Sequence, residues 1–475
     1  MARTVPLSSS APKRDAGTEK LVVAHYIVGL TGGGGAGDFT LDTWKQDIQL
    51  ASKKGIDGFA LNVGPDDYTD AQVGYAYQAA EEVGGFKLFL SLDMAAICGS
   101  KDCNSPDTAE YIRELTDRFI GEPAQLIVDG KPLVSTFAGE SCTFGEADVF
   151  TGWNKQFTQH PDIAGKIHFI PSFFIDIQQF HNFKDVMDGD FNFNGAWRTD
   201  FTTVSANSII GSDSGTDNLT AAQQQTVVDY LDSFMIDRWH TEQLALVEDS
   251  AHTYMTSIAP WFFTHFGADT YNKNFIYDCD NQLYARRWET IISNRDSVDI
   301  VQLLTWNDFG ESHYLGPIHG NLPPGADAWT DGFDHTGFLE ITSYFATWFK
   351  TGEQPTVAQD QLLMWARPHP KDAVANDTLS PPTNYELAQD QLWAVVLACG
   401  PGTVTLATSD MTSADYPVQA GVNYVNLTLT PGGYMHGTLK RDNAVVIDVK
   451  PEDYTFNPTP DKYNFNVFVA HGSSA

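Results

Sequence analysis

Short apolar runs rich in Val, Ile and Phe recur along the first two thirds of the chain. Eight such runs occur, at residues 21–30, 55–63, 86–94, 132–139, 166–174, 190–197, 252–263 and 297–306. Most positions in each run are apolar, and polar residues do not alternate with them regularly. This pattern is typical of strands that are buried on both faces of a sheet.

The stretches between these runs carry the periodicity of amphipathic helices. The clearest, residues 40–54, opens with a Thr that suits an N-cap, has an acidic first turn and stops at Gly55. Further helices are predicted over 70–83, 108–120, 283–295 and 341–350. Because each parallel crossover needs a helix, the alternation predicts a TIM (β/α)8 barrel over residues 21–354, preceded by a disordered segment, residues 1–20.

The pattern changes after Thr351. Residues 352–385 are rich in Pro, Asp and Thr, and the following apolar runs are shorter, with turn residues between them and no helix. The runs are LLMWARP, QLWAVVLAC, GTVTLAT, YVNLTLT, GYMHGTL, AVVIDV and YNFNVFVA. Such spacing predicts a second domain, an antiparallel β-sandwich over residues 355–475.

Composition narrows the possible partners. The chain has 475 residues, 42% of them hydrophobic and 12% aromatic, which is enough for two large cores. Asp and Glu number 61 against 28 Lys and Arg, a formal charge of −33 that disfavours nucleic acid and anionic membranes. No apolar run approaches the roughly 18 residues of a membrane span. A neutral substrate fits best, and we expect a monomer with no cofactor and no metal.

The cysteines and the N-terminus bear on the compartment. Five Cys leave at least one thiol unpaired within the chain, and Cys98 and Cys103 are close enough to bridge a small loop. Residues 1–20 lack the apolar stretch of a signal peptide, so the protein is either cytosolic or has had a signal removed. Three Asn-x-Ser/Thr sequons start at residues 218, 376 and 426. They are weak evidence for secretion, because such motifs also arise by chance.

The residues that end the predicted strands suggest the chemistry, because a TIM barrel holds its active site at the C-terminal strand ends. Carboxylates, amides, imidazoles and indoles gather there, and these are the groups from which a glycoside site is built. The candidates are His25, Tyr26, Asn62, Asp93, Glu140, Asn194, Trp197, Trp261, His265, Trp306, Asn307, Asp308, Glu311 and His313.

The densest segment is TWNDFGESHY, residues 305–314. Asp308 and Glu311 are three residues apart, so a helical turn would place both carboxylates on one side. Two neighbouring carboxylates separate their pKa values, which lets one act as an acid and the other as a base. The alternative is that Asp308 caps backbone N–H groups and Glu311 is solvated.

Other candidates also have structural alternatives. Asp93 follows the apolar run FLSL and could equally be the N-cap of the next helix. A strand-end residue such as Glu140 could hold a loop, and His25 could be a hydrogen-bonded core histidine. For Trp197 and Trp261, core packing is the commoner role of the side chain.

Long motifs resemble those of the fungal α-1,3-glucanases, or mutanases, of glycoside hydrolase family 71. The matching pieces are VAHYIVG, GIDGFALNVG, FKLFLSLDM, VSTFAGESCTFG, HFIPSFF, VMDGDFNFNGAW, APWFFTHFG, LYARRWE, LTWNDFGESHYLGPI and WARPHPKDA. They are spread over nearly the whole chain. The resemblance implies a secreted or wall-associated enzyme that hydrolyses α-1,3-glucan internally with inversion, on a barrel followed by a β-domain.

The resemblance also carries over site residues. It implies that Asp93, Asp308 and Glu311 are catalytic and that substrate is bound by His25, Asn62, Glu140, Trp197, Trp261, His265 and His313. Their positions near the strand ends also make substrate-binding candidates of Tyr26, Asn194, Trp306 and Asn307. Within the catalytic set we expect Glu311 to act as the acid, Asp308 as the base for water and Asp93 as a charged support. An inverting pair predicts carboxyl groups roughly 6.5–9.5 Å apart, whereas roughly 5 Å would favour retention.

One departure and two alternatives remain. Residues 198–251, between the sixth and seventh strands, look long and could remodel the wall of the substrate site. A glucan-binding wall protein without turnover would bind glucan and release no reducing ends. A barrel hydrolase acting on another α-glycan also stays open, because one sequence does not separate linkage preferences.

Overall fold

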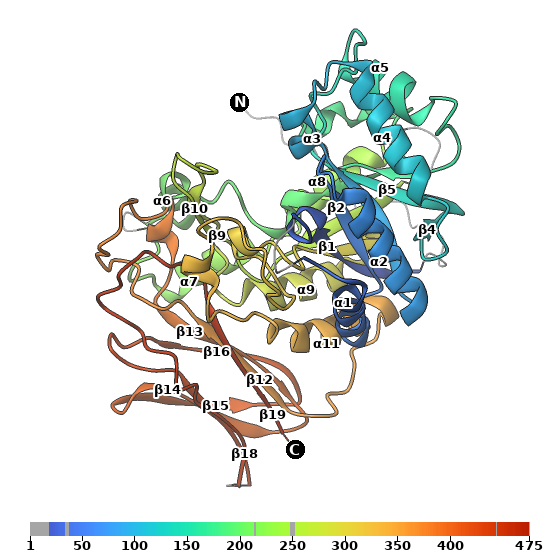
Figure 1. Ribbon diagram of the computed structural model, residues 1–475. Coiled ribbons are helices and arrows are strands. Elements are labelled where there is room, and N and C mark those ends of the chain that lie inside the picture. The colour runs from blue at the N-terminus through green and yellow to red at the C-terminus, as the bar shows by residue number, and fades with distance from the viewer. Residues whose placement is uncertain (1–18, 34–37, 213–214, 248–251, 443, 475) are drawn as a thin grey trace, which may run out of the picture.

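The computed structural model describes residues 19–33, 38–212, 215–247, 252–442 and 444–474. The expected disordered segment, residues 1–20, lies outside the described residues except for its last two. The molecule combines a curled, helix-flanked parallel sheet with a pair of antiparallel sheets that follow it in the chain (Figure 1).

Each of the eight apolar runs contains one strand of the parallel sheet. The strands are β1 (Leu21–Ile27), β2 (Gly58–Val63), β3 (Lys87–Asp93), β5 (Lys131–Phe137), β6 (His168–Ile170), β7 (Gly189–Asn192), β8 (Thr253–Ile258) and β11 (Ile300–Leu303). They run in the order β6-β5-β3-β2-β1-β11-β8-β7, and β4 (Ile127–Val128) pairs antiparallel with β5. Every residue of β2 and β8 is buried, as the apolar runs predicted.

The two ends of this sheet, β6 and β7, approach each other without forming a registered ladder. Two backbone hydrogen bonds join them, from Asp188 N to Phe169 O at 2.8 Å and from Phe191 N to Pro171 O at 3.0 Å. The sheet is therefore strongly curled, and its C-terminal strand ends face a common region.

The predicted helices are present, and the other connections are less regular. The five expected helices are α1 (Leu41–Lys53), α2 (Thr69–Val83), α4 (Pro106–Phe119), α9 (Leu283–Ser293) and α11 (Phe338–Thr351). Thr40 caps α1 in a capping box. The remaining crossovers hold the short helices α3 (Met94–Ser100), α5 (Val149–Trp153) and α10 (Asp327–Thr330), a 3-10 segment (Ile177–Phe183), and the hairpin β9 (Phe263–His265) and β10 (Asn274–Ile276).

The long segment 198–251 contains α6 (Thr203–Ile210), α7 (Ala221–Leu231) and α8 (Met235–Leu244). A buried ion pair fastens it to the sheet. Arg287 Nη1 lies 2.7 Å from Asp237 Oδ2, and Tyr254 donates to Asp237 Oδ1 at 2.8 Å. Both charged side chains are almost completely buried, so this insertion is built into the core at α8.

The C-terminal residues form two four-stranded antiparallel sheets, β16-β13-β12-β19 and β15-β14-β17-β18. The strands are β12 (Gln361–Ala366), β13 (Gln391–Ala398), β14 (Gly402–Ser409), β15 (Thr412–Val418), β16 (Gly421–Thr428), β17 (His436–Arg441), β18 (Ala444–Val449) and β19 (Phe468–Ser473). Side chains of both sheets share one buried apolar cluster. All seven predicted runs contain a strand, whereas β15, a half-exposed edge strand containing Pro417, was not predicted.

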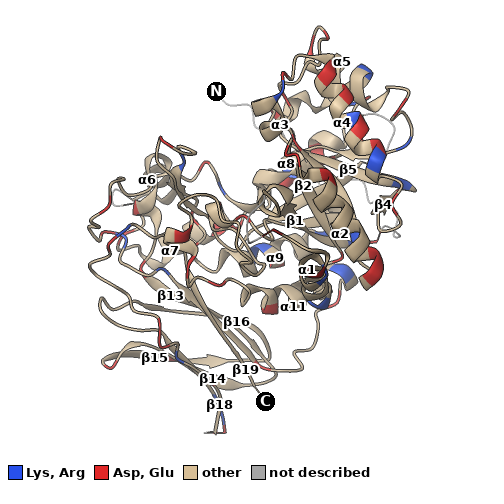
Figure 2. Ribbon diagram, in the orientation of Figure 1, with Lys and Arg blue, Asp and Glu red and all other residues tan. Residues whose placement is uncertain are grey.

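Charge is distributed over the whole molecule. Figure 2 shows acidic residues on the helices around the parallel sheet and on the antiparallel sheets alike. Across the described ranges, the model contains no helix with both the length and the apolar character that a membrane crossing requires.

Candidate active site

Asp308 and Glu311 lie on one 3-10 turn, Phe309–Glu311, that follows β11. Asp308 caps this turn, because its Oδ1 accepts the Glu311 N–H at 3.1 Å. The capping alternative raised from the sequence is therefore realised at Asp308. Its second oxygen remains available to other partners, so capping and chemistry are compatible at this residue.

His313 bridges the two carboxylates. Its Nε2 lies 3.0 Å from Asp308 Oδ2 and 3.3 Å from Glu311 Oε2, and its side chain is only 2% exposed. Burial alone would lower the pKa of His313, but the two carboxylates outweigh it and raise the pKa to about 9. The imidazole is therefore protonated at neutral pH and supplies one positive charge to the carboxylate pair.

Lys273, which the sequence did not suggest, supplies a second charge. It lies between β9 and β10, and its Nζ is 2.5 Å from Glu311 Oε1. Burial would raise the pKa of Glu311, but the hydrogen bond and charge of His313, together with Lys273, lower it to about 2. Glu311 is therefore ionised throughout the neutral and mildly acidic range.

Asp93 has the opposite electrostatic environment. It ends β3 and caps α3, with its Oδ1 accepting the Ala96 N–H at 2.9 Å. Burial raises the pKa of its carboxyl group, and the opposing effects of the Ala96 N–H, the Asn62 side chain and the Lys273 charge do not cancel that rise. Lys273 contacts Glu311 directly, and the negative charges of Asp308 and Asp93 add to that of Glu311 in raising the pKa of Lys273.

Several other predicted residues support this centre. His25 Nδ1 accepts a hydrogen bond from Gln302 Nε2 at 3.0 Å, and burial together with the charge of His313 lowers the pKa of His25 to about 3, so it is neutral. Asn307 brackets the end of β1, accepting from Ile27 N at 2.7 Å and donating to Ile27 O at 2.9 Å. The ring of Trp197 packs 5.4 Å from that of His313.

Three predicted residues lie elsewhere. Side chains alternate along a strand, so His25 points into the sheet's interior and Tyr26 points outward, where its hydroxyl donates to Asp47 on α1 at 2.7 Å. Trp261 donates to Phe465 O at 2.7 Å in the C-terminal segment, and Trp306 is completely buried. The contacts of these three side chains are those of core residues, and their expected role in substrate binding stays a prediction.

The remaining candidates hold loops together. His265 lies on β9 and joins Asn274 Oδ1, at 2.7 Å, to Asp377 Oδ2, at 3.2 Å. Glu140 Oε2 accepts the Phe174 N–H at 3.3 Å, which matches the loop-holding alternative. Asn194 is half-buried in the 3-10 turn after β7.

The donor atoms of Asp308, Glu311 and His313 all lie within 4.8 Å of one another, a spacing that a metal ion could use. In this group His313 Nε2 contacts Asp308 Oδ2 at 3.0 Å and Glu311 Oε2 at 3.3 Å, so the imidazole already pairs with both carboxylates. Lys273 already occupies one oxygen of Glu311. The group therefore fits an ion-paired network better than a metal centre.

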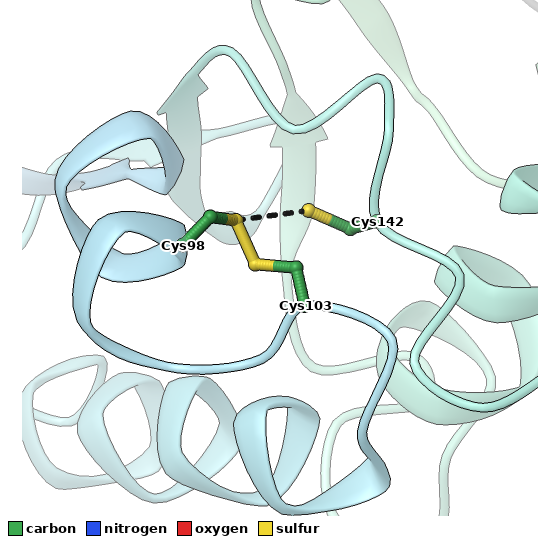
Figure 3. A group of neighbouring side chains, drawn as sticks. All are labelled: Cys98, Cys103 and Cys142. Atoms are coloured by element: carbon green, nitrogen blue, oxygen red, sulfur yellow. Dashed lines mark hydrogen bonds between the residues drawn. A yellow bond between two sulfur atoms is a disulfide. The ribbon is translucent and has the colours of Figure 1, made fainter.

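The predicted disulfide between Cys98 and Cys103 is present (Figure 3). A third residue, Cys142, points toward it, with its Sγ 3.4 Å from Cys98 Sγ. We refer to Cys98, Cys103 and Cys142 as the sulfur cluster. It joins the segment after α3 to the loop that carries Glu140, next to the strand end that bears Asp93.

The sequence of the whole chain places this centre in a known class. The chain belongs to glycosyl hydrolase family 71, whose family model matches residues 18–475. It is therefore a glycoside hydrolase, as the resemblance of its motifs implied.

Individual relatives can be named. The chain is 33% identical to a glucan endo-1,3-alpha-glucosidase, agn1, of Schizosaccharomyces pombe, over 95% of this chain and 94% of the relative. It is 31% identical to a mutanase of Penicillium rubens, over 95% and 88%. Among solved structures, a GH99 endo-alpha-mannosidase from Bacteroides thetaiotaomicron matches 70% of this chain and 98% of its own, with 14% identity and a TM-score of 0.44.

Proposed function

We propose that this protein hydrolyses α-1,3-glucosidic bonds within α-1,3-glucan, with inversion at the anomeric carbon. Membership of the family and the names of the two relatives support the substrate. The observation that carries the chemistry is the network in which His313 contacts Asp308 and Glu311 and Lys273 contacts Glu311, which lowers the pKa of Glu311, while burial raises the pKa of Asp93. Opposite ionisation of neighbouring carboxyl groups is what acid–base cleavage of a glycoside requires.

The electrostatics favour Asp93 as the general acid. Its raised pKa keeps a larger fraction of the carboxyl protonated, whereas the pKa of about 2 at Glu311 leaves no proton to donate. This assignment differs from the one expected from the sequence, in which Glu311 was the acid. The difference arises from Lys273 and His313, whose contacts with Glu311 only the folded chain reveals.

Asp308 keeps its expected role as the base for water. One carboxylate oxygen of Asp308 lies within 4.8 Å of one of Glu311, closer than the roughly 6.5–9.5 Å that leaves room for a water between an inverting pair. The acid and the base therefore come from different strand ends in this proposal, Asp93 after β3 and Asp308 after β11. Glu311 positions the charged side chains of His313 and Lys273 beside the glycosidic bond that is cleaved.

The same proposal extends to the fold and the compartment. The two backbone hydrogen bonds between β6 and β7 support a closed eight-stranded barrel over residues 21–354, followed by a β-sandwich over residues 355–475. The disulfide supports secretion, because disulfides persist mainly in oxidising compartments. A third relative, 27% identical, is an ascus wall endo-1,3-alpha-glucanase of Schizosaccharomyces pombe.

The roles are separable with two substrates. Wild type is expected to release β-anomeric sugars from insoluble α-1,3-glucan, followed by NMR. An α-glucosyl fluoride of an α-1,3-linked oligosaccharide needs no acid, because fluoride leaves unprotonated. Asp93→Asn should therefore lose glucan hydrolysis and keep most fluoride hydrolysis, whereas Asp308→Asn should lose both.

Three outcomes would overturn parts of the proposal. Fluoride hydrolysis kept by Glu311→Gln and lost by Asp93→Asn would make Glu311 the acid. Release of α-anomers would replace inversion with retention. Glucan bound by wild type with no sugar released would favour the non-catalytic wall protein.

A further inference from the structure

Two exposed aromatic side chains lie near the carboxylates and take no part in the chemistry described above. Phe174, in the segment after β6, is 40% exposed, and Tyr271, between β9 and β10, is 54% exposed. An exposed aromatic ring held by other rings is a rigid, flat apolar surface, which suits the face of a sugar ring.

Phe174 belongs to a group of rings beside Asp93. Its ring centroid lies 5.4 Å from that of Phe137, which in turn lies 4.8 Å from that of Phe193. Phe137 and Asp93 are partners in the register of β5 and β3, so the group begins directly beside the proposed acid. Phe193 also contacts the neutral His25 at 5.6 Å, which connects the group to the floor of the site.

Tyr271 belongs to a second group, on the side of Glu311. Its ring lies 4.6 Å from that of Phe266, and Phe266 N donates to Lys273 O, the residue whose ammonium binds Glu311. Phe266 also packs against the catalytic turn, since a Cβ built on Gly310 would lie 3.3 Å from its ring. In Figure 1 the β9–β10 hairpin and β5 lie on opposite sides of β1.

From this arrangement we infer that Phe174 and Tyr271 are stacking positions for glucosyl residues on opposite sides of the bond that is cleaved. The inference rests on the proposed function and adds to it the path of the glucan chain. The chain runs from the ring beside Asp93, across the carboxylates, to the ring beside Glu311.

The test compares Phe174→Ala and Tyr271→Ala with Tyr75→Ala. Tyr75 is 43% exposed on α2 and serves as a matched aromatic control outside the site. With long α-1,3-linked glucooligosaccharides, each site variant should raise KM roughly five- to tenfold with little change in kcat, the range that an aromatic stacking contact provides. The control should match wild type.

A second readout separates stacking from a general loss of structure. Oligosaccharides of one defined length, labelled at the reducing end, report which bond is cut. Because the two variants remove binding on opposite sides, the preferred bond should move in opposite directions. Phe174→Leu keeps most of the apolar volume but has no flat face, so it should raise KM and move the cleaved bond as Phe174→Ala does. It replaces Phe174→Ala in the test if the alanine variant folds poorly.

The outcomes distinguish this inference from the function on which it rests. An active wild type with site variants that match Tyr75→Ala would refute the stacking positions and leave the function intact. A shift of both variants toward the same end would refute their opposite placement. A wild type that cleaves no α-1,3-glucan would overturn the proposed function itself.

Discussion

His313 offers the sharpest test of the electrostatic network. Its pKa rises from 6.5 to about 9 in the folded protein because it lies between Asp308 and Glu311. A pKa change of this size corresponds to about 3 kcal/mol of stabilisation while the imidazole is charged. The lowered pKa of Glu311 reflects the same contacts in part, so the two effects are not added.

The pH dependence follows from the direction of each change. The raised pKa of His313 contributes its full stabilisation below about pH 6.5 and loses it as the pH rises through about 9. The lowered pKa of Glu311 contributes above about pH 4.5 and is lost as the pH falls toward about 2. Both contributions are complete only between roughly pH 4.5 and 6.5, so the network should stabilise the folded protein most in that pH range.

The perturbation is His313→Gln, which keeps a hydrogen-bonding side chain and removes the charge. Thermal unfolding of wild type and variant should differ by several degrees at pH 5.5. The difference should shrink steadily from pH 6.5 to 9.5. His436→Gln is the control, because His436 forms a partly exposed pair with Asp448 on the antiparallel sheets and should contribute little. A difference that stays constant from pH 5.5 to 9.5 would refute the charge argument, since it would indicate lost packing alone.

Three further predictions test other contacts. Lys273→Met removes one of the two positive charges beside Glu311, so the pKa of Glu311 should rise toward its ordinary value. The acidic limb of the pH–rate profile for glucan hydrolysis should then move to higher pH, and an unchanged limb would contradict this. Asp237→Ala leaves Arg287 buried without its partner and should cost about 3–5 kcal/mol in denaturant unfolding, with unchanged kcat in the folded fraction. Cys103→Ser leaves Cys98 and Cys142 as neighbouring thiols, and added oxidised glutathione, itself reduced to two thiols, should convert them to a disulfide that mass spectrometry detects as a linked peptide; two free thiols after this treatment would contradict the prediction.

The strands were predictable because their signal is local. Residues buried on both faces of a sheet must be apolar at nearly every position, and each of the eight runs does contain a strand. The helix over residues 40–54 was predictable from its cap and its terminal Gly. The 3-10 segment between β6 and β7 was not, because tertiary packing decides whether a short polar connection becomes a full helix.

The site was predictable only where a strand end marked it. Asp93, Asp308 and His313 follow apolar runs, and the structure brings them into one network. Lys273 comes from a hairpin, and no spacing in the sequence connects it to a residue 38 positions later. Tyr26, one residue after His25, contacts Asp47 on α1 instead, since a shift of one residue along a strand moves a side chain to the other face.

The antiparallel sheets share a buried core with the parallel sheet. Trp365, Trp393 and Phe465 belong to the buried cluster that also contains the strands of the parallel sheet. Trp393 Nε1 donates to the buried Asp280 at 2.8 Å, and Trp261 Nε1 donates to Phe465 O at 2.7 Å. A chain that ended near residue 355 would expose this apolar surface and would leave the Asp280 carboxyl group and the Trp261 indole without these partners. The sheets therefore act first as a structural cover for the parallel sheet, and any contact they make with glucan is additional to that role.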